Sequence, residues 1–368
     1  ISKRTINFVK RIYIKPNANN DYDKNELKEM FANAVRQCSI GRRKIGVFLS
    51  GGIDSTIVAY ELQQIKNDVN TFTNRITPDT VAEEDYNSDS KMAQKFATEQ
   101  GFKHHDVVIS PKEYLSAWED SIWYQEQPIY NPSNAMYCYT NKYLAENDIV
   151  VTLAGDMGDE LFGGYPKYLE LFRKIKKPTS WRELLSLWMQ RIKKGSYALT
   201  ETLEDDTVLL DELEKCYGDE LWNPKDPTAS YMALDCVAQV PDCFLARNDN
   251  YGMAYSMEGR FPLASKKFMQ YCLDIKSKHK FARGSTKSLV KESYKDFLPN
   301  YIINKPKTGW TVPIGYWIMD GVDNDLSKVY ANTIGADRLK LVGRSQKIGK
   351  RLIPEWQIKS WKEKYKIK

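Results

Sequence analysis

The chain has 368 residues, of which 42% are hydrophobic and 28% are charged, and its formal net charge at pH 7 is +6. This length is comfortable for two domains, and no apolar run approaches the ~18 residues of a membrane span, which excludes a membrane protein. The six cysteines include no Cys-x-x-Cys pair, so we expect a cytoplasmic protein without a zinc site and with all six cysteines as small buried residues.

Residues 1–22 are first strand-like and then turn-like, a pattern that suits a connector. The chain begins at Ile1 rather than at Met, so we expect a piece of a longer protein or a renumbered mature form. A helical pattern follows from Lys24 to Gln37, and Lys44–Leu49 has the composition of a buried strand. We therefore expect the connector to lead into an α/β domain over residues 23–165.

A Gly-rich turn joins this strand to the next helical pattern, Ser55–Gln64. A tight turn at a helix N-terminus presents free backbone N–H groups, and the helix dipole favours a phosphate there. The glycines permit positive φ and close backbone approach, while a carboxylate beside a phosphate implies a bridging magnesium ion. The residues expected to bind a nucleotide in this turn are Leu49, Ser50, Gly51, Gly52, Asp54 and Ser55.

After this turn, patterns typical of strands and helices alternate along the chain. Strands are predicted at 69–76, 103–109 and 149–153, and helices at 83–100, 111–123 and 134–146. Such alternation implies a parallel sheet with right-handed crossovers. The predicted fold class is α/β, a parallel twisted sheet with helices on both faces, followed by a mainly helical C-terminal part over residues 166–368.

A second turn, after the predicted strand at 149–153, carries acidic residues next to Gly155. They are Asp156, Asp159 and Glu160. Carboxylates this close repel one another, so a shared cation or a network of donors is needed to stabilise them. Because ligands bind at the carboxyl ends of strands in parallel sheets, we expect this turn and the phosphate turn to meet in one crevice.

Two later segments depart from the helical pattern of the second half. Residues 195–228 are acidic, and we interpret them as a surface excursion. A basic C-terminal tail from Lys347 onward is interleaved with Trp356, Trp361 and Tyr365. Such a tail could bind RNA or an acidic partner, but it is more often a solvated helix face with a few packed anchors, which is the interpretation we favour.

Four segments, taken in order, resemble signatures of known families. The turn at 49–55 is similar to the PP-loop of ATP pyrophosphatases, which cleave ATP between the α and β phosphates. Residues 149–165 resemble the Ser-Gly-Asp/Glu-Gly-Ser/Gly-Asp-Glu-Leu/Val-Phe-Gly-Gly-Tyr signature of asparagine synthetases. Residues 256–263 and 305–313 resemble two further segments of that family. The matches together cover most of residues 40–320.

The chain departs from these signatures at a few positions. Ala154 stands for the usual Ser, Met157 for a Gly and Trp310 for a Phe. Ala264-Ser265 follows Phe-Pro-Leu where the family has Leu-Asp or Phe-Asp. None of these positions belongs to the expected magnesium or pyrophosphate residues, so the departures concern the identity of the substrate.

The resemblance implies roles for individual residues. Asp54 and Asp159 would bind Mg2+ beside ATP, and Gly155 would belong to the nucleotide site. Lys307 aligns with the family lysine that contacts the phosphates as charge develops in the reaction. Asp156 aligns with the acid proposed to bind or deprotonate the incoming amine.

Three further residues are assigned to the side of the site that would hold the acyl substrate. Glu258 and Arg260 are expected to form a buried ion pair that shapes the site. Glu126, with the following Asn131-Pro132-Ser133, resembles the family loop before the substrate helix, which helps to recognise the carboxylate or the adenine.

By resemblance, the chain is an ATP-dependent amide-forming ligase of the asparagine synthetase type, with aspartate and ammonia as the expected substrates. In glutamine-dependent asparagine synthetases, a glutaminase domain precedes such a connector, and its nucleophile is a Cys at the mature N-terminus. Here the first cysteine is Cys38, in a helical pattern, so we expect these residues to contain no glutaminase. Ammonia would come from solution, from a preceding glutaminase domain or from a separate subunit. The alternatives are a β-lactam synthetase-like or lasso-peptide cyclase-like enzyme, a tRNA-modifying PP-loop enzyme and a catalytically silent relative. We expect no nucleic-acid or membrane partner, and a homo-oligomer stays open.

Overall fold

The computed structural model describes residues 14–77, 83–127, 131–195, 206–306, 312–314, 317, 328 and 356–367. The chain folds as two compact units, each of which draws on three segments. The sheet unit comprises residues 25–156, 241–263 and 291–368, and the helical unit comprises residues 1–24, 157–240 and 264–290. The domain boundaries expected at residues 22 and 165 stay a prediction.

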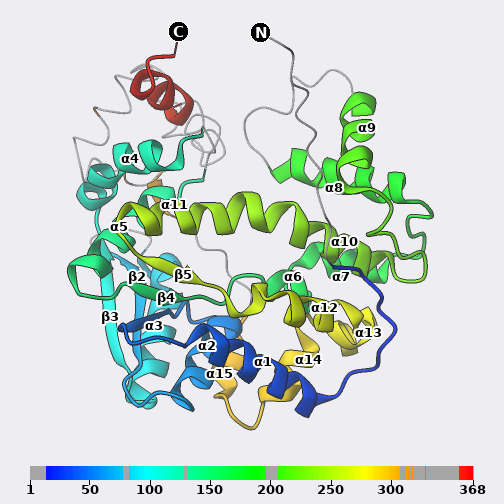
Figure 1. The fold of residues 1–368 in the computed structure, drawn as a ribbon, viewed down its shortest axis with the longest axis horizontal. Helices are drawn as coiled ribbons and strands as arrows, with labels where there is room; N and C mark the ends of the chain where they lie inside the picture. The colour runs from blue at the N-terminus through cyan, green and yellow to red at the C-terminus, as the bar shows by residue number, and fades with distance from the viewer. Residues whose placement is uncertain are drawn as a thin grey trace. The chain divides into compact units, whose positions relative to one another are not determined.

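A five-stranded parallel sheet forms the centre of the sheet unit (Figure 1). Its strands are β1 (Ile45–Phe48), β2 (Asn70–Ile76), β3 (Lys103–Ile109), β4 (Val151–Leu153) and β5 (Glu258–Arg260). Their order is β3-β2-β1-β4-β5, and every neighbouring pair is parallel. The chain therefore leaves β1 in one direction for β2 and β3 and returns to its other side with β4. This reversal places the topological switch point, where parallel sheets bind ligands, at the carboxyl ends of β1 and β4.

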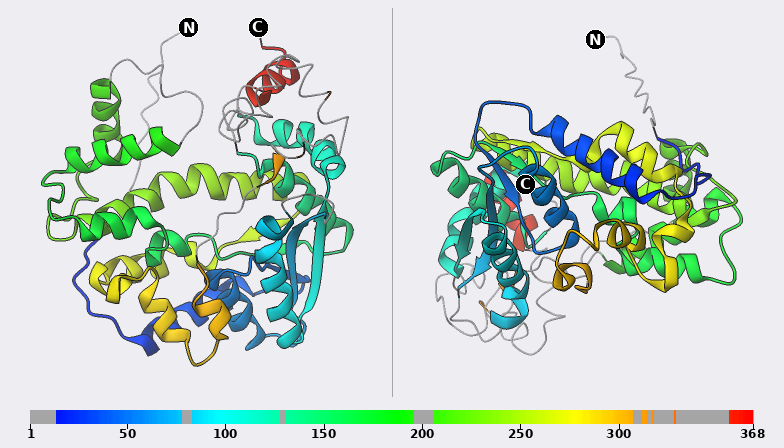
Figure 2. Two further views of the ribbon diagram at one scale, coloured as in Figure 1. Left: turned by 180° about the vertical axis from the view of Figure 1, so that it is seen from behind. Right: turned by 90° about the horizontal axis from the view of Figure 1, so that it is seen from below.

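Helices cover both faces of the sheet, as expected (Figure 2). Side chains from one face of β2 and β3, including Phe72 and Val107, share a buried core with α4, α5 and α11. On β1 and β2, side chains alternate between the two faces, and α2 and α3 contact these strands. The helices of this unit are α1 (Lys24–Cys38), α2 (Ile53–Gln63), α3 (Glu83–Glu99), α4 (Pro111–Gln125), α5 (Asn134–Glu146), α11 (Ala246–Ala254) and α15 (Asn300–Ile303), and α14 (Ser288–Tyr294) continues into it from the helical unit.

The helical unit contains no strand among its described residues. Its α-helices are α6 (Gly158–Phe162), α7 (Pro166–Arg173), α8 (Trp181–Gly195), α9 (Asp206–Tyr217), α10 (Pro227–Val237), α12 (Lys266–Asp274) and α13 (Ser277–Lys280). A π-helical stretch, η2 (Val240–Leu245), precedes α11, and short 3-10 turns lie at η3 (Pro262–Ala264) and η4 (Ala282–Gly284).

The predicted strands and helices up to residue 153 are confirmed with shifts of one or two residues at their ends. Two elements further along the chain were not predicted. The segment 195–228 is not only a surface excursion, because α9 lies within it and Arg182 of α8 forms ion pairs with Asp211 and Glu214 of α9. The strand β5 was not predicted at all.

The cysteines also differ from the expectation in part. All six are free, but Cys216 and Cys243 are exposed and Cys38 is half-buried, so only Cys138, Cys236 and Cys272 behave as buried hydrophobic residues. The described helices include none that combines the length and apolar character needed to cross a membrane. At the C-terminal end, Trp356 stacks on Trp118 with ring centroids 3.9 Å apart, which confirms that aromatic residues of this segment are packed anchors.

Candidate active site

The phosphate turn lies between β1 and α2, as the sequence predicts. Leu49 is fully buried, and its N–H donates to the Phe72 carbonyl at 2.9 Å, so the sheet ladder ends at the turn. The Ser50 N–H donates to Ser55 Oγ at 3.1 Å, and the two hydroxyl oxygens lie 3.0 Å apart. The Ser55 hydroxyl in turn donates to the Gly52 carbonyl at 3.1 Å. The conformation of the turn is thus fixed by its own side chains.

One glycine sets the position of this turn. Gly51 has φ +67, and a Cβ there would collide with the backbone oxygen of Asp89 on α3, so only glycine fits. Asp89 also forms an ion pair with Lys305 at 2.7 Å, and the Lys305 side chain is only 7% exposed. The segment that leads to Lys307 is therefore anchored beside the phosphate turn. Lys307 itself lies outside the described residues.

The two sequence motifs meet at Gly155, after the end of β4. A Cβ on Gly155 would lie 2.6 Å from the Ser55 nitrogen and 2.8 Å from the Asp54 carbonyl carbon. The backbone of the second turn is therefore in direct contact with the first turn of α2, at the switch point of the sheet. Within the sheet unit the two turns are therefore in contact, and Asp156 of the second turn also lines a pocket.

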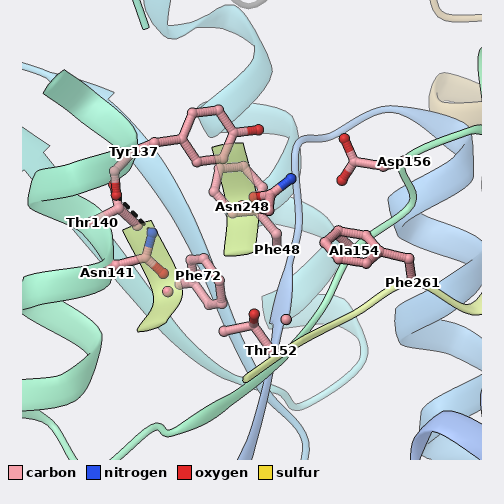
Figure 3. A pocket seen from close by; sticks show the side chains of 12 residues that line it. Phe48, Phe72, Tyr137, Thr140, Asn141, Thr152, Ala154, Asp156, Asn248 and Phe261 are labelled. Atoms are coloured by element: carbon pink, nitrogen blue, oxygen red, sulfur yellow. Dashed lines mark hydrogen bonds between the residues drawn. The ribbon is translucent and has the colours of Figure 1, made fainter. Parts of the chain in front are cut away.

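A pocket lies between the sheet and helices α5 and α11 (Figure 3). It is lined by Phe48, Phe72, Tyr137, Thr140, Asn141, Thr152, Ala154, Asp156, Asn248, Gly252, Gly259 and Phe261. Asp156 is the one acidic residue among these lining residues, which include no lysine or arginine. The pocket is therefore mostly neutral, with four aromatic rings and a single carboxylate in its lining.

Tyr137 connects this pocket to a buried cation. Its ring stacks on Phe48 with centroids 5.9 Å apart, and the guanidinium carbon of Arg247 lies 4.0 Å from its centroid. Burial raises the pKa of Tyr137 to about 12, an effect that the Arg247 charge opposes and the Asp156 charge reinforces. Arg247 and Asp156 thus act electrostatically on the same hydroxyl group.

Asp159 lies in the helical unit, on the short helix α6, where Lys287 forms an ion pair with it at 2.6 Å. Both side chains are about nine-tenths buried, with 12% of the surface exposed for Asp159 and 9% for Lys287. A Cβ on Gly164 would collide with both partners of the pair, so a larger residue there would have to displace one of the two side chains. Sequence reasoning missed Lys287, and the glycine pair at 163–164 is the only signal that pointed to a crowded site.

Two further residues of this turn are unusual, one in its backbone conformation and one in its burial. Met157, which stands where the asparagine synthetase signature has Gly, adopts φ +75, a left-handed conformation that is costly for a side chain with a Cβ. Glu160 is 1% exposed and accepts a hydrogen bond from the Tyr165 hydroxyl at 2.9 Å. Burial, reinforced by the Asp159 charge, raises the pKa of Glu160 to about 8. Glu160 is thus suited to a structural role as a neutral acid.

The expected ion pair between Glu258 and Arg260 is present, with Arg260 Nε 2.8 Å from Glu258 Oε1, but it is not buried. The Glu258 side chain is 61% exposed, because β5 is the edge strand of the sheet. Arg260 also donates to the carbonyl oxygens of Cys38 and Ile40 at 2.8 and 2.7 Å. The pair therefore ties the end of α1 to the sheet rather than shaping the pocket.

Glu126 caps the C-terminus of α4 with φ +61 and is exposed, and its carbonyl accepts a hydrogen bond from Trp361 Nε1 at 3.2 Å. Its expected contact with a substrate stays a prediction. The loop that follows positions Ser133, whose hydroxyl donates to Asn131 Oδ1 at 2.7 Å.

The expected magnesium ligands, Asp54 and Asp159, stay a prediction. In the described part of the chain, no three His, Cys, Asp or Glu side chains gather so as to hold a metal ion by themselves. Mg2+ at nucleotide sites normally uses one or two carboxylates together with phosphate oxygens and water. Asp54, at the N-terminus of α2 beside the phosphate turn, is a carboxylate of this kind in the sheet unit, and Asp159, the second expected ligand, belongs to the helical unit.

Comparisons with known proteins place the chain among asparagine synthases. The family model for asparagine synthase matches residues 26–360. The chain is 25% identical over 306 residues to asparagine synthetase [glutamine-hydrolyzing] 1 of Bacillus subtilis, covering 74% of the chain and 47% of that protein. It is 26% identical over 352 residues to a putative asparagine synthetase [glutamine-hydrolyzing] of Mycobacterium bovis, covering 85% and 52%. The chain thus spans about half the length of these curated relatives.

Among solved structures, the chain is similar to the U34-tRNA thiolase NcsA from Methanococcus maripaludis with its [4Fe-4S] cluster. The sequence identity is 18%, the TM-score is 0.31, and the match covers 66% of this chain and 83% of the other.

Proposed function

Because the chain belongs to the asparagine synthase family, we propose that it is an ATP-dependent ligase that adenylates a carboxylate and then converts it to an amide with ammonia. The preferred acyl substrate in this proposal is aspartate, activated at its side-chain carboxylate. The observation that carries the proposal is the contact of Gly155 with Asp54 and Ser55, which brings the start of the acidic turn against the phosphate turn. We propose that the two turns border one crevice.

The chemistry explains why such a crevice is needed. A carboxylate does not react with ammonia at neutral pH, since its oxygen is a poor leaving group. Attack of the carboxylate oxygen on the α-phosphorus of ATP forms an acyl-adenylate and releases pyrophosphate. Ammonia then forms the C–N bond, AMP leaves with the carboxylate oxygen, and one proton is lost. The protein must align the reactants and stabilise the charge that develops on the phosphates.

In this proposal the backbone N–H groups of residues 50–55 and the hydroxyls of Ser50 and Ser55 bind the β and γ phosphates. Lys307 would contact the same phosphates, as its resemblance to the family lysine implies. Asp156 borders the pocket and would accept the proton of the incoming amine. Lys287, paired with Asp159, positions that carboxylate.

Asp54 and Asp159 would hold magnesium, which supplies charge neutralisation on the triphosphate when bound. Support comes from the resemblance of the two turns that carry these carboxylates to the signatures of the family.

The test is to incubate the protein with ATP, Mg2+, ammonium chloride and a panel of carboxylates led by L-aspartate, and to measure AMP, ADP and pyrophosphate. We expect substrate-dependent release of AMP and pyrophosphate, lost in Asp54→Asn and retained in the control Asp68→Asn, which changes the same charge at an exposed position. Release of ADP and phosphate, or full activity of Asp54→Asn, would refute the proposal.

A further inference from the structure

Arg247 is a buried cation that the proposed reaction has not yet used. It lies in the first turn of α11 and is 5% exposed. Its Nη1 donates to Ser133 Oγ at 3.2 Å, and its guanidinium packs on the Tyr137 ring. The buried Nε makes no hydrogen bond, and no carboxylate among the described residues forms an ion pair with this side chain.

The buried positive charge of Arg247 is unfavourable in free energy unless an anion binds to it. A guanidinium group cannot lose its proton in a protein, so burial cannot neutralise Arg247 as it would a lysine. A buried charge without a counter-ion is strongly unfavourable. The planar group with its free Nε–H is suited to bind a carboxylate through two parallel hydrogen bonds.

Arg247 is a neighbour of two residues that line the pocket. Tyr137 and Asn248 line the pocket, and Arg247 packs on the first and precedes the second in sequence. The described residues that line the pocket provide one carboxylate, Asp156, and no cation. A substrate that brings a second carboxylate into this region would find its counter-ion in Arg247.

We propose that Arg247 binds the non-reacting carboxylate of a dicarboxylic amino acid and thereby selects it against monocarboxylic substrates. This inference rests on the proposed function and adds a specificity-determining residue to it. Ser133 and Tyr137 are positioning residues in this arrangement, since both contact the guanidinium group. The anion that competes for the same role is a phosphate of ATP, and the two sources give different outcomes in the test.

The test compares L-aspartate with β-alanine, which is aspartate without the α-carboxylate, in wild type and Arg247→Gln. We expect wild type to prefer aspartate, and Arg247→Gln to lower kcat/KM for aspartate about 10- to 100-fold, as expected for hydrogen bonds to a charged group. In Arg247→Gln, kcat/KM for β-alanine and the KM for ATP should equal those of wild type. Arg36→Gln, at an exposed position of α1, is the matched control and should behave as wild type.

If Arg247 had a purely structural role, Arg247→Gln would lower kcat/KM for aspartate and for β-alanine alike. A folded Arg247→Gln protein whose ratio of kcat/KM for aspartate to kcat/KM for β-alanine equals that of wild type therefore overturns the inference. A raised KM for ATP with an unchanged ratio would assign the residue to a phosphate and overturn it as well. If Arg247→Gln does not fold, Arg247→Lys and Ser133→Ala are measured instead, and a ratio that equals that of wild type in both refutes the inference.

The failure of this inference is distinguishable from the failure of the proposed function. If wild type releases pyrophosphate with aspartate but the ratio is insensitive to Arg247, only the inference fails. If wild type releases no pyrophosphate with any carboxylate, the proposed function fails. Titration calorimetry with L-aspartate and β-alanine without ATP then decides on Arg247, since binding of aspartate alone, lost in Arg247→Gln, supports the inference and equal binding of both contradicts it.

Discussion

Gly155→Ala tests the contact between the two turns most sharply. The new Cβ would lie 2.6 Å from the Ser55 nitrogen, whereas ordinary contact begins at 3.4 Å, so the turns must separate by about 3.4 − 2.6 = 0.8 Å. Both atoms that it meets first belong to the backbone, so no flexible side chain can relieve the clash. Overpacking of this kind costs about 1–3 kcal/mol in stability.

The effect on catalysis should be larger than the effect on stability. A misplacement of about 1 Å at reacting groups lowers rates by roughly 100-fold. We therefore expect Gly155→Ala to release pyrophosphate about 10- to 100-fold more slowly at saturating ATP, with a melting temperature only a few degrees below that of wild type. Steady-state pyrophosphate release and thermal unfolding followed by circular dichroism measure the two quantities.

The control is Gly101→Ala, at the turn between α3 and β3. Gly101 has φ +70, and a Cβ added there would meet no atom within 4 Å, so alanine costs about 1 kcal/mol of backbone strain without moving the phosphate turn. This variant should be destabilised to a similar extent and remain active. Gly155→Ala with a rate within twofold of wild type would refute the reasoning, as would an equal loss of activity in Gly101→Ala.

Three further predictions concern single side chains. Asp54→Asn should abolish the magnesium dependence of ATP binding, measured by calorimetry with and without Mg2+; ATP affinity that still rises with Mg2+ in this variant would contradict the assignment. Lys287→Met should lower kcat more than 10-fold, because it leaves the Asp159 carboxylate buried without its partner, and a variant that matches wild type in pyrophosphate release would remove Lys287 from the site. Burial raises the pKa of Glu61, and the hydrogen bond that Tyr294 donates to it at 2.8 Å opposes this shift. The folded protein therefore keeps a proton on Glu61 that the unfolded chain releases above about pH 4.5. The contribution of this carboxyl group to stability should therefore fall as the pH rises from 4.5, and urea unfolding should show Glu61→Gln gaining stability relative to wild type between pH 5 and pH 8; a difference that does not change with pH would exclude this effect.

The sheet up to β4 was predictable because its strands are apolar runs between turn signals, and its helices have apolar residues on one face. The strand β5 was not. It has only three residues, Glu258, Gly259 and Arg260, whose pairing with β4 comes from a distant part of the chain. As an edge strand it leaves the Glu258 side chain exposed, which a sequence pattern does not reveal. The helix α9 was missed because its acidic residues dominate the composition of 195–228.

In the candidate site, too, some residues could be predicted from the sequence and others could not. The phosphate turn was predictable since its residues are contiguous and their order carries the chemistry. Lys287 and Arg247 were not, because each is defined by a partner far away in the sequence, Asp159 for the first and Ser133 for the second. A lysine or arginine in a polar stretch is ordinarily exposed, and only the folded chain shows that these two are buried.

The most direct test of the central claim uses L-aspartate labelled with 18O in its side-chain carboxylate. Adenylation transfers one of these oxygens to the leaving group, so the account predicts AMP that carries one 18O atom together with unlabelled pyrophosphate. Mass spectrometry of the products distinguishes the routes. Labelled inorganic phosphate with ADP, or AMP without label, would contradict the claim that the crevice at Gly155 activates a carboxylate by adenylation.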